Sequence, residues 1–110
     1  MRWVLVVVVL ALAACGPTVP DTEDGQKLFV AMCSRCHEVD GRSSPKLRAE
    51  LGTPDMTTEE WQAAHPTDVI KRTIVHGSKS KKMPAFGAAS FSAKQLDALA
   101  AHVKTLGARR

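Results

Sequence analysis

The feature that most constrains this chain is the pentapeptide Cys33-Ser34-Arg35-Cys36-His37. Its two thiols stand three positions apart, and an imidazole follows the second thiol directly. At this spacing both thiols can reach the two vinyl groups on one edge of a porphyrin, while the imidazole reaches the iron from the same side. The pentapeptide therefore predicts one covalently attached haem c, with thioethers at Cys33 and Cys36 and an axial iron ligand at His37.

A zinc site and a redox-active dithiol are the alternatives for such a cysteine pair. A structural zinc site needs two further ligands at a characteristic spacing. The chain has no second cysteine pair, and its remaining histidines, His65, His76 and His102, are scattered. A thioredoxin-like dithiol belongs in a βαβ setting, and no segment has a convincing strand pattern. Both alternatives are therefore disfavoured.

The N-terminus has the pattern of an export signal. Arg2 precedes a nearly unbroken apolar run that is too short to cross a bilayer comfortably as a permanent helix. The run ends in Leu12-Ala13-Ala14-Cys15, which resembles the bacterial lipobox, where cleavage falls just before a cysteine that carries a diacylglycerol. We expect residues 1–14 to be a lipoprotein signal peptide and residues 15–22 to be the lipidated Cys15 and a short tether. The alternatives are an uncleaved anchor and an unmodified thiol.

Export and lipidation also account for the cysteine count. The chain has three cysteines, and an odd number in an exported protein calls for an explanation. Haem takes two of them and lipid takes the third, so we expect no disulfide even though the compartment allows one. The predicted location is the periplasmic or cell-surface side of a membrane.

Length and charge bound the rest of the chain. With 110 residues, it has room for one small domain, which we place at residues 23–110. The formal net charge is +4. Nucleic-acid binding is nevertheless not expected, because the sequence has neither a recognition-helix pattern nor aromatic residues interleaved with basic ones for base stacking.

The spacing of apolar residues predicts helices separated by long loops. A first helix should begin near residues 22–24, where acidic residues suit the positive end of a helix, and should carry both cysteines on one face. Residues 39–54 have the glycine, serine and proline content of a loop. Thr57 and Glu60 form a capping box that opens a short helix bearing Trp61, which a His-Pro pair ends.

Two further helices complete the predicted fold. One runs from Thr67 to His76 and stops at Gly77. After a loop over residues 78–90, Ser92 and Gln95 form a second capping box that opens the last helix. With no convincing strand and no repeat, the predicted fold class is all-α. Irregular loops this long are uncommon in a small domain unless something orders them, and a haem would do so.

Over about residues 22–106, the chain resembles the class I cytochrome c family. Gly25 and Phe29 match the glycine and the aromatic residue of the family's first helix, and residues 99–106 resemble its final helix. His102 stands where the family usually has an aromatic residue. The resemblance implies a cytochrome c fold, in which the N- and C-terminal helices pack together and the intermediate helices and loops surround one haem.

The same resemblance implies a set of residues around the haem. Met83-Pro84 resembles the family's distal loop, so Met83 is the expected second axial ligand, held in a loop that proline stiffens. Ser44-Pro45-Lys46-Leu47 resembles the segment after the haem motif. Pro45 would then accept a hydrogen bond from the ring N–H of His37, and Leu47 would cover the haem edge. Trp61 would line the haem, or would donate its indole N–H to a haem propionate.

The remaining histidines, methionines and lysines have more ordinary predicted places. His65, His76 and His102 are expected at the surface or in packing, with a bis-histidine haem as the alternative. Met32 is expected in the core, and Met56 is a lesser candidate for the iron ligand. Three lysines border the distal loop and form either a docking rim for an acidic partner or a solvated loop: Lys79, Lys81 and Lys82.

These inferences converge on an electron carrier rather than an enzyme. Two filled axial positions leave the iron no open site for catalysis. We expect a membrane-anchored monohaem cytochrome that transfers single electrons between redox protein partners (an oxidase, a reductase or a dehydrogenase) outside the cytoplasm, with no small-molecule substrate. The alternatives are a haem-bearing subunit of a larger oxidoreductase and a haem sensor with a labile sixth ligand.

Overall fold

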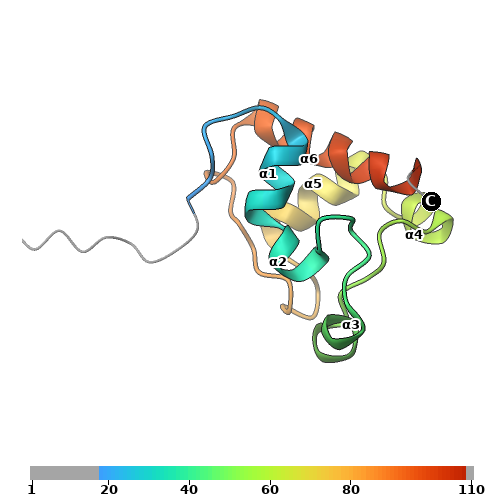
Figure 1. Ribbon diagram of the computed structural model, residues 1–110. Helices are drawn as coiled ribbons and strands as arrows, with labels where there is room; N and C mark the ends of the chain where they lie inside the picture. Colours follow the sequence, from blue (N-terminus) through green and yellow to red (C-terminus); the bar gives the residue numbers. More distant parts are fainter. Residues whose placement is uncertain (1–17, 109–110) are drawn as a thin grey trace, which may run out of the picture.

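The computed structural model describes residues 18–108. Within them no strand occurs, so the all-α prediction is confirmed. Figure 1 shows α1, α5 and α6 gathered together, with α3 set apart from them at the end of long loops. The helices in chain order are α1 (Gly25–Met32), α2 (Ser34–His37), α3 (Pro45–Leu51), α4 (Glu59–Ala64), α5 (Thr67–His76) and α6 (Ala93–Thr105), followed by a 3-10 turn, η1 (Leu106–Ala108).

Two parts of the sequence prediction lie outside the described residues. These are the signal peptide over residues 1–14 and the lipidated Cys15. Between residues 18 and 108, no helix is both long enough and apolar enough to cross a lipid bilayer.

The first and last helices pack directly against each other. α1 begins after Asp24, whose side chain accepts a hydrogen bond from the Lys27 N–H at 3.1 Å. Gly25 lies so close to α6 that a Cβ atom there would overlap the Ala98 carbonyl. Its missing side chain therefore permits the close approach of the two helices. The core between them includes residues that are 5% exposed or less: Leu28, Phe29, Leu99, Ala100 and Val103.

His102 supplies an aromatic ring at this helix crossing. It is buried on α6, and its ring centroid lies 5.1 Å from that of Phe29 with the ring planes tilted by 50°. Tilted aromatic pairs at this separation are favourable. The imidazole therefore packs in the place where the family resemblance leads one to expect an aromatic residue, and the crossing is retained.

α5 completes the helical core and leads to the distal loop. It runs over the predicted residues and ends at Gly77, whose N–H donates to the Thr73 carbonyl at 2.7 Å. Its inward side chains, Ile70 and Ile74, are buried in the same core as α1 and α6. The prediction for this helix is confirmed.

α3 occupies a segment that the sequence composition predicts as loop. The residues typical of loops stand instead at the two ends of a helix. Ser44 caps it by accepting a hydrogen bond from the Leu47 N–H at 3.1 Å, and Pro45 is its first residue. Gly52 ends it in the left-handed conformation, with φ 67°. Loop composition and helix-end composition are the same here, which explains the error.

The start of α4 is one residue later than the capping-box pattern predicts. Thr58 caps the helix by accepting a hydrogen bond from the Trp61 N–H at 3.2 Å. The Thr57 hydroxyl donates instead to Oδ1 of Asp55 at 2.6 Å. The threonine that the pattern favours is therefore engaged in the preceding turn.

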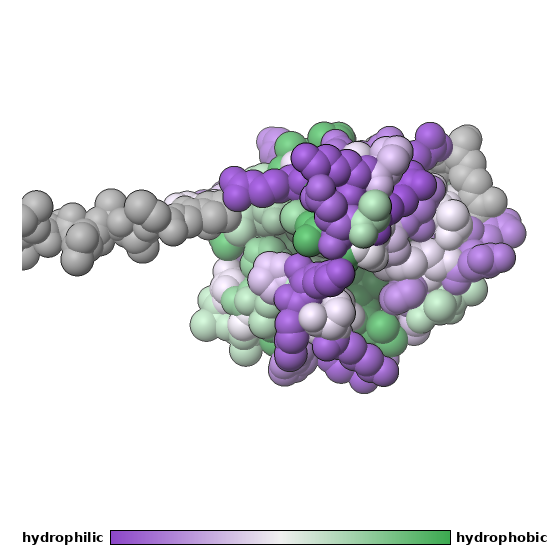
Figure 2. All heavy atoms as spheres, turned by 90° about the horizontal axis from the view of Figure 1, so that it is seen from below, coloured by the Kyte–Doolittle hydropathy of each residue, from purple (hydrophilic) through white to green (hydrophobic). Residues whose placement is uncertain are grey.

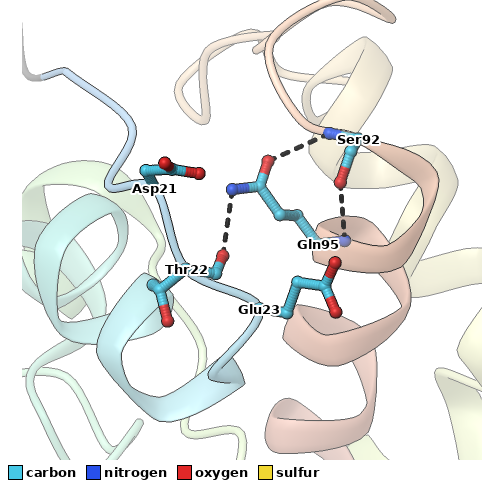
Figure 3. Close-up of a pocket in the computed structure, with 5 residues that line it drawn as sticks. All are labelled: Asp21, Thr22, Glu23, Ser92 and Gln95. Carbon is cyan, nitrogen blue, oxygen red and sulfur yellow. Dashed lines mark hydrogen bonds between the residues drawn. The ribbon is translucent and has the colours of Figure 1, made fainter.

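The N-terminal segment is fastened to the start of α6. Ser92 and Gln95 form the predicted capping box, each bonding the backbone N–H of the other. The Gln95 amide nitrogen Nε2 also donates to the carbonyls of Pro20 at 3.1 Å and Thr22 at 3.0 Å, and Figure 3 shows the Gln95 side chain between these elements. One side chain thus joins the entry of the chain into the domain with the last helix.

Candidate functional site

A cavity of about 440 Å³ lies between the cysteine motif, the distal loop and α4. Its volume falls within the range of roughly 300–1,000 Å³ that is common for ligand and cofactor sites. Figure 2 shows a face on which hydrophobic residues lie in a recess bordered by hydrophilic ones. The cavity brings together five residues predicted for the site: Cys33, Cys36, His37, Trp61 and Met83. Apolar side chains make up much of the remaining lining: Phe29, Met32, Met56, Ile70, Ile74, Phe86 and Val103.

The two cysteines reach the cavity through a break between α1 and α2. The predicted single helix ends at Met32, and Cys33 has a non-helical φ of −120°. The Cys33 carbonyl accepts the N–H of His37 at 3.0 Å, which closes the short turn of α2. Both cysteines are half-buried free thiols. Burial, and to a lesser degree the charge of Cys36, raises the pKa of the Cys33 thiol to about 12, so this thiol is protonated at neutral pH.

His37 presents a neutral imidazole on the same wall. Burial lowers the pKa of this ring below the ordinary value of 6.5, and a neutral ring is the form that binds a metal. Its Nδ1 atom is buried without a hydrogen-bond partner among residues 18–108. A buried nitrogen without a partner carries a cost in stability.

The hydrogen bond predicted between His37 and the Pro45 carbonyl is absent from the described residues. Pro45 is the first residue of α3, so its carbonyl points along that helix toward the N–H four residues later. Neither Pro45 nor Leu47 is among the residues that line the cavity. The structure therefore does not bring these two residues to the site.

Other polar contacts hold the backbone that follows His37. Ser43 is 7% exposed. It donates its N–H to the His37 carbonyl at 3.1 Å and its hydroxyl to the Cys36 carbonyl at 3.2 Å. Arg48 of α3 in turn donates to the Ser43 carbonyl at 3.4 Å. α3 thus supports the His37 wall through Arg48 and Ser43.

Met83 lies on the distal loop, which begins where α5 ends. Gly77 ends α5 with φ 78°, and a Cβ atom there would lie 2.7 Å from the Met83 carbonyl oxygen. The Ser78 N–H donates to that carbonyl at 3.1 Å, and the Ser78 hydroxyl accepts the Met83 N–H at 3.1 Å. Farther along the loop, the Phe86 N–H donates to the Ile74 carbonyl at 3.0 Å. The loop is therefore tied back to α5 on both sides of Met83.

The three lysines of the distal loop have different surroundings. All three are exposed, but within residues 18–108 no hydrogen bond or ion pair engages the side chain of Lys79 or Lys81. Lys82 lines the cavity, and its Nζ donates to the Glu50 carbonyl in the last turn of α3 at 3.3 Å. Lys82 therefore links the distal loop to α3. A docking role for these lysines stays a prediction.

α4 forms a further wall of the cavity. The ring of Trp61 stacks on that of His65, with centroids 4.1 Å apart and planes 13° from parallel, and both residues line the cavity. Gln62 fastens α4 in place, because its Nε2 donates to the carbonyls of Met56 at 2.8 Å and Val103 at 2.9 Å. The aromatic pair therefore stands on a helix that is bonded to α6.

Sequence reasoning gave a minor place to two residues of the cavity, His65 and Met56, and missed a third residue beside it, Ser78. His65, which the sequence places at the surface or in packing, lines it. Met56 lies in a polar stretch of sequence, yet it is 4% exposed and also lines the cavity. Ser78 holds the backbone of Met83, and nothing in the spacing of the sequence pairs these two residues.

Comparison with known proteins places the chain in a family. Residues 20–103 match the family described as cytochrome C oxidase, cbb3-type, subunit III. The chain belongs to this family of c-type cytochromes. The FixP subunit of a cbb3-type cytochrome c oxidase from Azorhizobium caulinodans is 34% identical over 98 residues, which are 89% of this chain and 31% of that protein. The CcoP subunit from Rubrivivax gelatinosus is 32% identical over 82 residues, which are 74% of this chain and 25% of that protein. This cytochrome thus spans a third or less of the length of these relatives.

Solved structures share the fold. The KustC0563 c-type cytochrome superposes with a TM-score of 0.66 at 29% identity, covering 76% of this chain and 96% of that one. A point mutant of the same protein gives a TM-score of 0.65 at 30% identity, with coverages of 76% and 98%. The predicted class I cytochrome c fold is confirmed, and with it the covalently bound haem c.

The residues of the cavity fit that haem. The thiols of Cys33 and Cys36 would form its thioethers, and the neutral ring of His37 beside them would bind the iron. The neutral, buried ring of His37 and the apolar lining agree with a site for a large apolar cofactor. Bound haem supplies one-electron chemistry between Fe(III) and Fe(II). Thioether formation removes both thiols from titration.

Proposed function

We propose that this cytochrome is a membrane-anchored monohaem electron carrier that passes single electrons between redox protein partners outside the cytoplasm. The cavity carries the electron-transfer part of the proposal, because it brings Met83 of the distal loop together with Cys33, Cys36 and His37. Backbone hydrogen bonds hold His37 through Ser43 and hold Met83 through the loop. Two ligands held in this way favour electron transfer over chemistry at an open iron position.

Met83 is the proposed sixth ligand among the three methionines that line the cavity. Met56 is the strongest competitor because it is buried there. The Met56 side chain, however, ends beside Gly41, in the loop that follows His37. A Cβ atom built on Gly41 would lie 3.5 Å from the Met56 methyl carbon. Met83 instead comes from the distal loop. A thioether ligand favours reduced iron and raises the reduction potential.

Leucine variants of the three methionines test this assignment. Met83→Leu keeps the bulk of the side chain and removes its sulfur, so we expect the oxidised protein to lose the optical band of sulfur-ligated iron and its reduction potential to fall. Met32→Leu and Met56→Leu are the matched controls and should keep the band. A band that survives in Met83→Leu, or disappears in Met56→Leu, would show that the ligand is assigned wrongly.

The anchoring part rests on the Leu12-Ala13-Ala14-Cys15 pattern. In this proposal residues 1–14 are removed, Cys15 carries lipid, residues 15–22 are the tether, and residues 23–110 form the domain on the periplasmic or cell-surface side. Cys15→Ser should leave the protein unlipidated and either uncleaved or released from the membrane, as seen by mass spectrometry and fractionation. Gly16→Ala is the control. Unchanged cleavage and membrane attachment in Cys15→Ser would refute the lipid anchor.

A second candidate function comes from the relatives. FixP and CcoP are described as subunits of cbb3-type oxidases, which favours a haem-bearing subunit of a larger oxidoreductase. A dedicated subunit forms one stable complex, whereas a mobile carrier makes weak, salt-sensitive contacts. Purification from detergent-solubilised membranes in high salt separates the two. We expect the cytochrome alone, and recovery of a stoichiometric complex would establish the subunit instead.

A further inference from the structure

Ser43, in the loop after α2, bonds both peptide groups that flank His37. Its hydroxyl donates to the Cys36 carbonyl at 3.2 Å, and its N–H donates to the His37 carbonyl at 3.1 Å. The Cys36 carbonyl belongs to the peptide group before the His37 Cα atom, and the His37 carbonyl belongs to the peptide group after it. Because peptide groups are planar, holding both of them fixes the two backbone dihedral angles of His37.

These two angles govern where the His37 imidazole can point, because the allowed side-chain rotamers depend on the backbone conformation. The His37 N–H is held as well, by the Cys33 carbonyl at 3.0 Å. The ring itself gains no such support at Nδ1, which has no hydrogen-bond partner among residues 18–108. Within this part of the chain, the orientation of the ring therefore depends on bonds to its backbone.

Ser43 adopts a backbone conformation that suits glycine better than serine. Its φ is 62°, in the left-handed region, where a side chain is strained. Glycine would take this conformation without that penalty, but glycine has no hydroxyl to bond the Cys36 carbonyl. Strained residues persist where the surrounding structure holds them in place. The strain at Ser43 accompanies a bond that only its side chain can make.

Hydrogen bonds from α3 hold Ser43 on its outer side. Arg48 donates Nη2 to the Ser43 carbonyl at 3.4 Å and Nε to the Arg42 carbonyl at 3.1 Å. Ser43 is also buried, so water competes little for its hydroxyl. A displacement of Ser43 would therefore break bonds to α3 as well as those to α2.

The rest of this loop has little room to move. Gly41 is buried, and a Cβ atom there would lie 2.5 Å from Cδ1 of Leu106 in η1. The Gly41 carbonyl accepts the Met56 N–H at 2.9 Å. The loop is thus held against η1 and against the segment before α4, which keeps Ser43 beside α2.

We propose that Ser43 is a positioning residue for electron transfer, which fixes the orientation of the His37 imidazole on the iron through the Cys36 and His37 carbonyls. Groups that hold a metal ligand from behind set its orientation. A ligand held in one orientation in both oxidation states keeps small the rearrangement that accompanies electron transfer. This role rests on the proposed ligation of iron by His37, but on neither Met83 nor the lipid anchor.

Ser43→Gly tests the hydroxyl, because glycine keeps the backbone N–H and readily adopts the φ of 62°. Proton NMR of the oxidised holoprotein reports the direction of the imidazole plane, since that plane sets the pattern of the haem methyl shifts. We expect Ser43→Gly to change this pattern and to slow electron self-exchange. An unchanged pattern overturns the proposal. A changed pattern with the wild-type self-exchange rate overturns the part of Ser43 in electron transfer.

Ser92→Ala is the control for loss of stability alone. It removes a serine hydroxyl that accepts the Gln95 N–H at 3.1 Å at the start of α6, and Ser92 does not line the cavity. The variant should be less stable than the wild type but should keep its methyl shifts and self-exchange rate. If Ser92→Ala changed both as Ser43→Gly does, the effect would be one of general destabilisation and the proposal would fail.

A second measurement needs no variant. In the wild-type holoprotein the Ser43 amide hydrogen should exchange slowly with solvent, because it is bonded to the His37 carbonyl. Exchange as fast as in an unstructured peptide would overturn the proposal even if Ser43→Gly failed to fold.

The wild-type spectrum also separates this proposal from the proposed function. Ligation by His37 predicts ring signals that are strongly shifted by the oxidised iron. Their absence would refute the ligation, and the role of Ser43 with it. Their presence, together with an unchanged methyl pattern in Ser43→Gly, would refute the role of Ser43 alone.

Discussion

Ser78 holds the backbone of Met83 from both sides. Its hydroxyl accepts the Met83 N–H at 3.1 Å, and its own N–H donates to the Met83 carbonyl at 3.1 Å. The residue that would bind the iron is thus fixed by a serine five positions earlier, at the first turn after α5. The placement of Met83 therefore depends on the loop that precedes it as much as on its own side chain.

Ser78→Ala should loosen this arrangement without removing the sulfur. It deletes the hydroxyl acceptor and leaves the backbone bond, so the loss of unfolding free energy should be about 1 kcal/mol. The optical band of sulfur-ligated iron should disappear at lower denaturant concentration than in the wild type. Ser90→Ala is the control, because the Ser90 hydroxyl bonds the Phe86 carbonyl in the same loop. Identical ligand loss in both variants would contradict a specific role for Ser78.

Gly25→Ala should weaken the crossing of α1 and α6. The added methyl group would overlap the Ala98 carbonyl, which is backbone and cannot turn aside. Overpacking of this kind costs roughly 1–3 kcal/mol, and the better helix propensity of alanine offsets part of it. Thermal unfolding of the holoprotein measures the change, with Gln26→Ala as an exposed control on the same helix. A Gly25→Ala protein as stable as the wild type would mean that the helices separate easily.

Gln62→Met should release α4 from α6. Methionine keeps the length of the side chain but cannot donate to the carbonyls of Met56 and Val103. The Val103 carbonyl keeps the Leu106 N–H as a donor, whereas the Met56 carbonyl loses its bond from Gln62, so the loss should be about 1 kcal/mol, which denaturant unfolding would detect. Gln26→Met, at an exposed site, controls for the substitution itself. Equal effects at the two positions would contradict the fastening role of Gln62.

Asp55 should contribute a pH-dependent part of the stability. The hydrogen bond from the Thr57 side chain is the main cause that lowers the pKa of Asp55 below its ordinary 3.8, and nearby arginines add to it. Since the folded state then binds the proton less tightly than the unfolded state, this stability is present above the ordinary pKa and is lost as the pH falls through the lowered one.

Unfolding measured between about pH 2 and 6 tests this sign. Asp55→Asn should be less stable than the wild type near pH 6, and the difference should shrink toward pH 2. Asp21→Asn, at an exposed carboxylate, is the control for the substitution itself. A constant difference for Asp55→Asn would show that its effect is not one of charge.

The sequence was sufficient for features that depend on neighbours along the chain. The pentapeptide, α5 with its stop at Gly77 and the capping box of α6 all follow local rules, and the structure bears out the last two. α3 was not predictable from composition, because serine, proline and glycine are as suitable for helix ends as for loops.

Contacts between distant segments were harder to predict. His65 joins the cavity because Gln62 and Lys104 hold α4 against α6, and these bonds connect residues about 40 positions apart. Pro45 fails to reach His37 because an unexpected helix redirects its carbonyl. In each case the deciding partner belongs to another element, which spacing along the chain does not reveal.

The bonds from Gln95 to the carbonyls of Pro20 and Thr22 have a consequence for reach. They fasten the tether to the domain at Pro20, and five Cα–Cα steps separate Pro20 from Cys15. At full extension these steps span about 17 Å. With a lipid on Cys15, the domain would therefore stay within a small protein's diameter of the bilayer, and its search for a partner would become lateral diffusion in two dimensions.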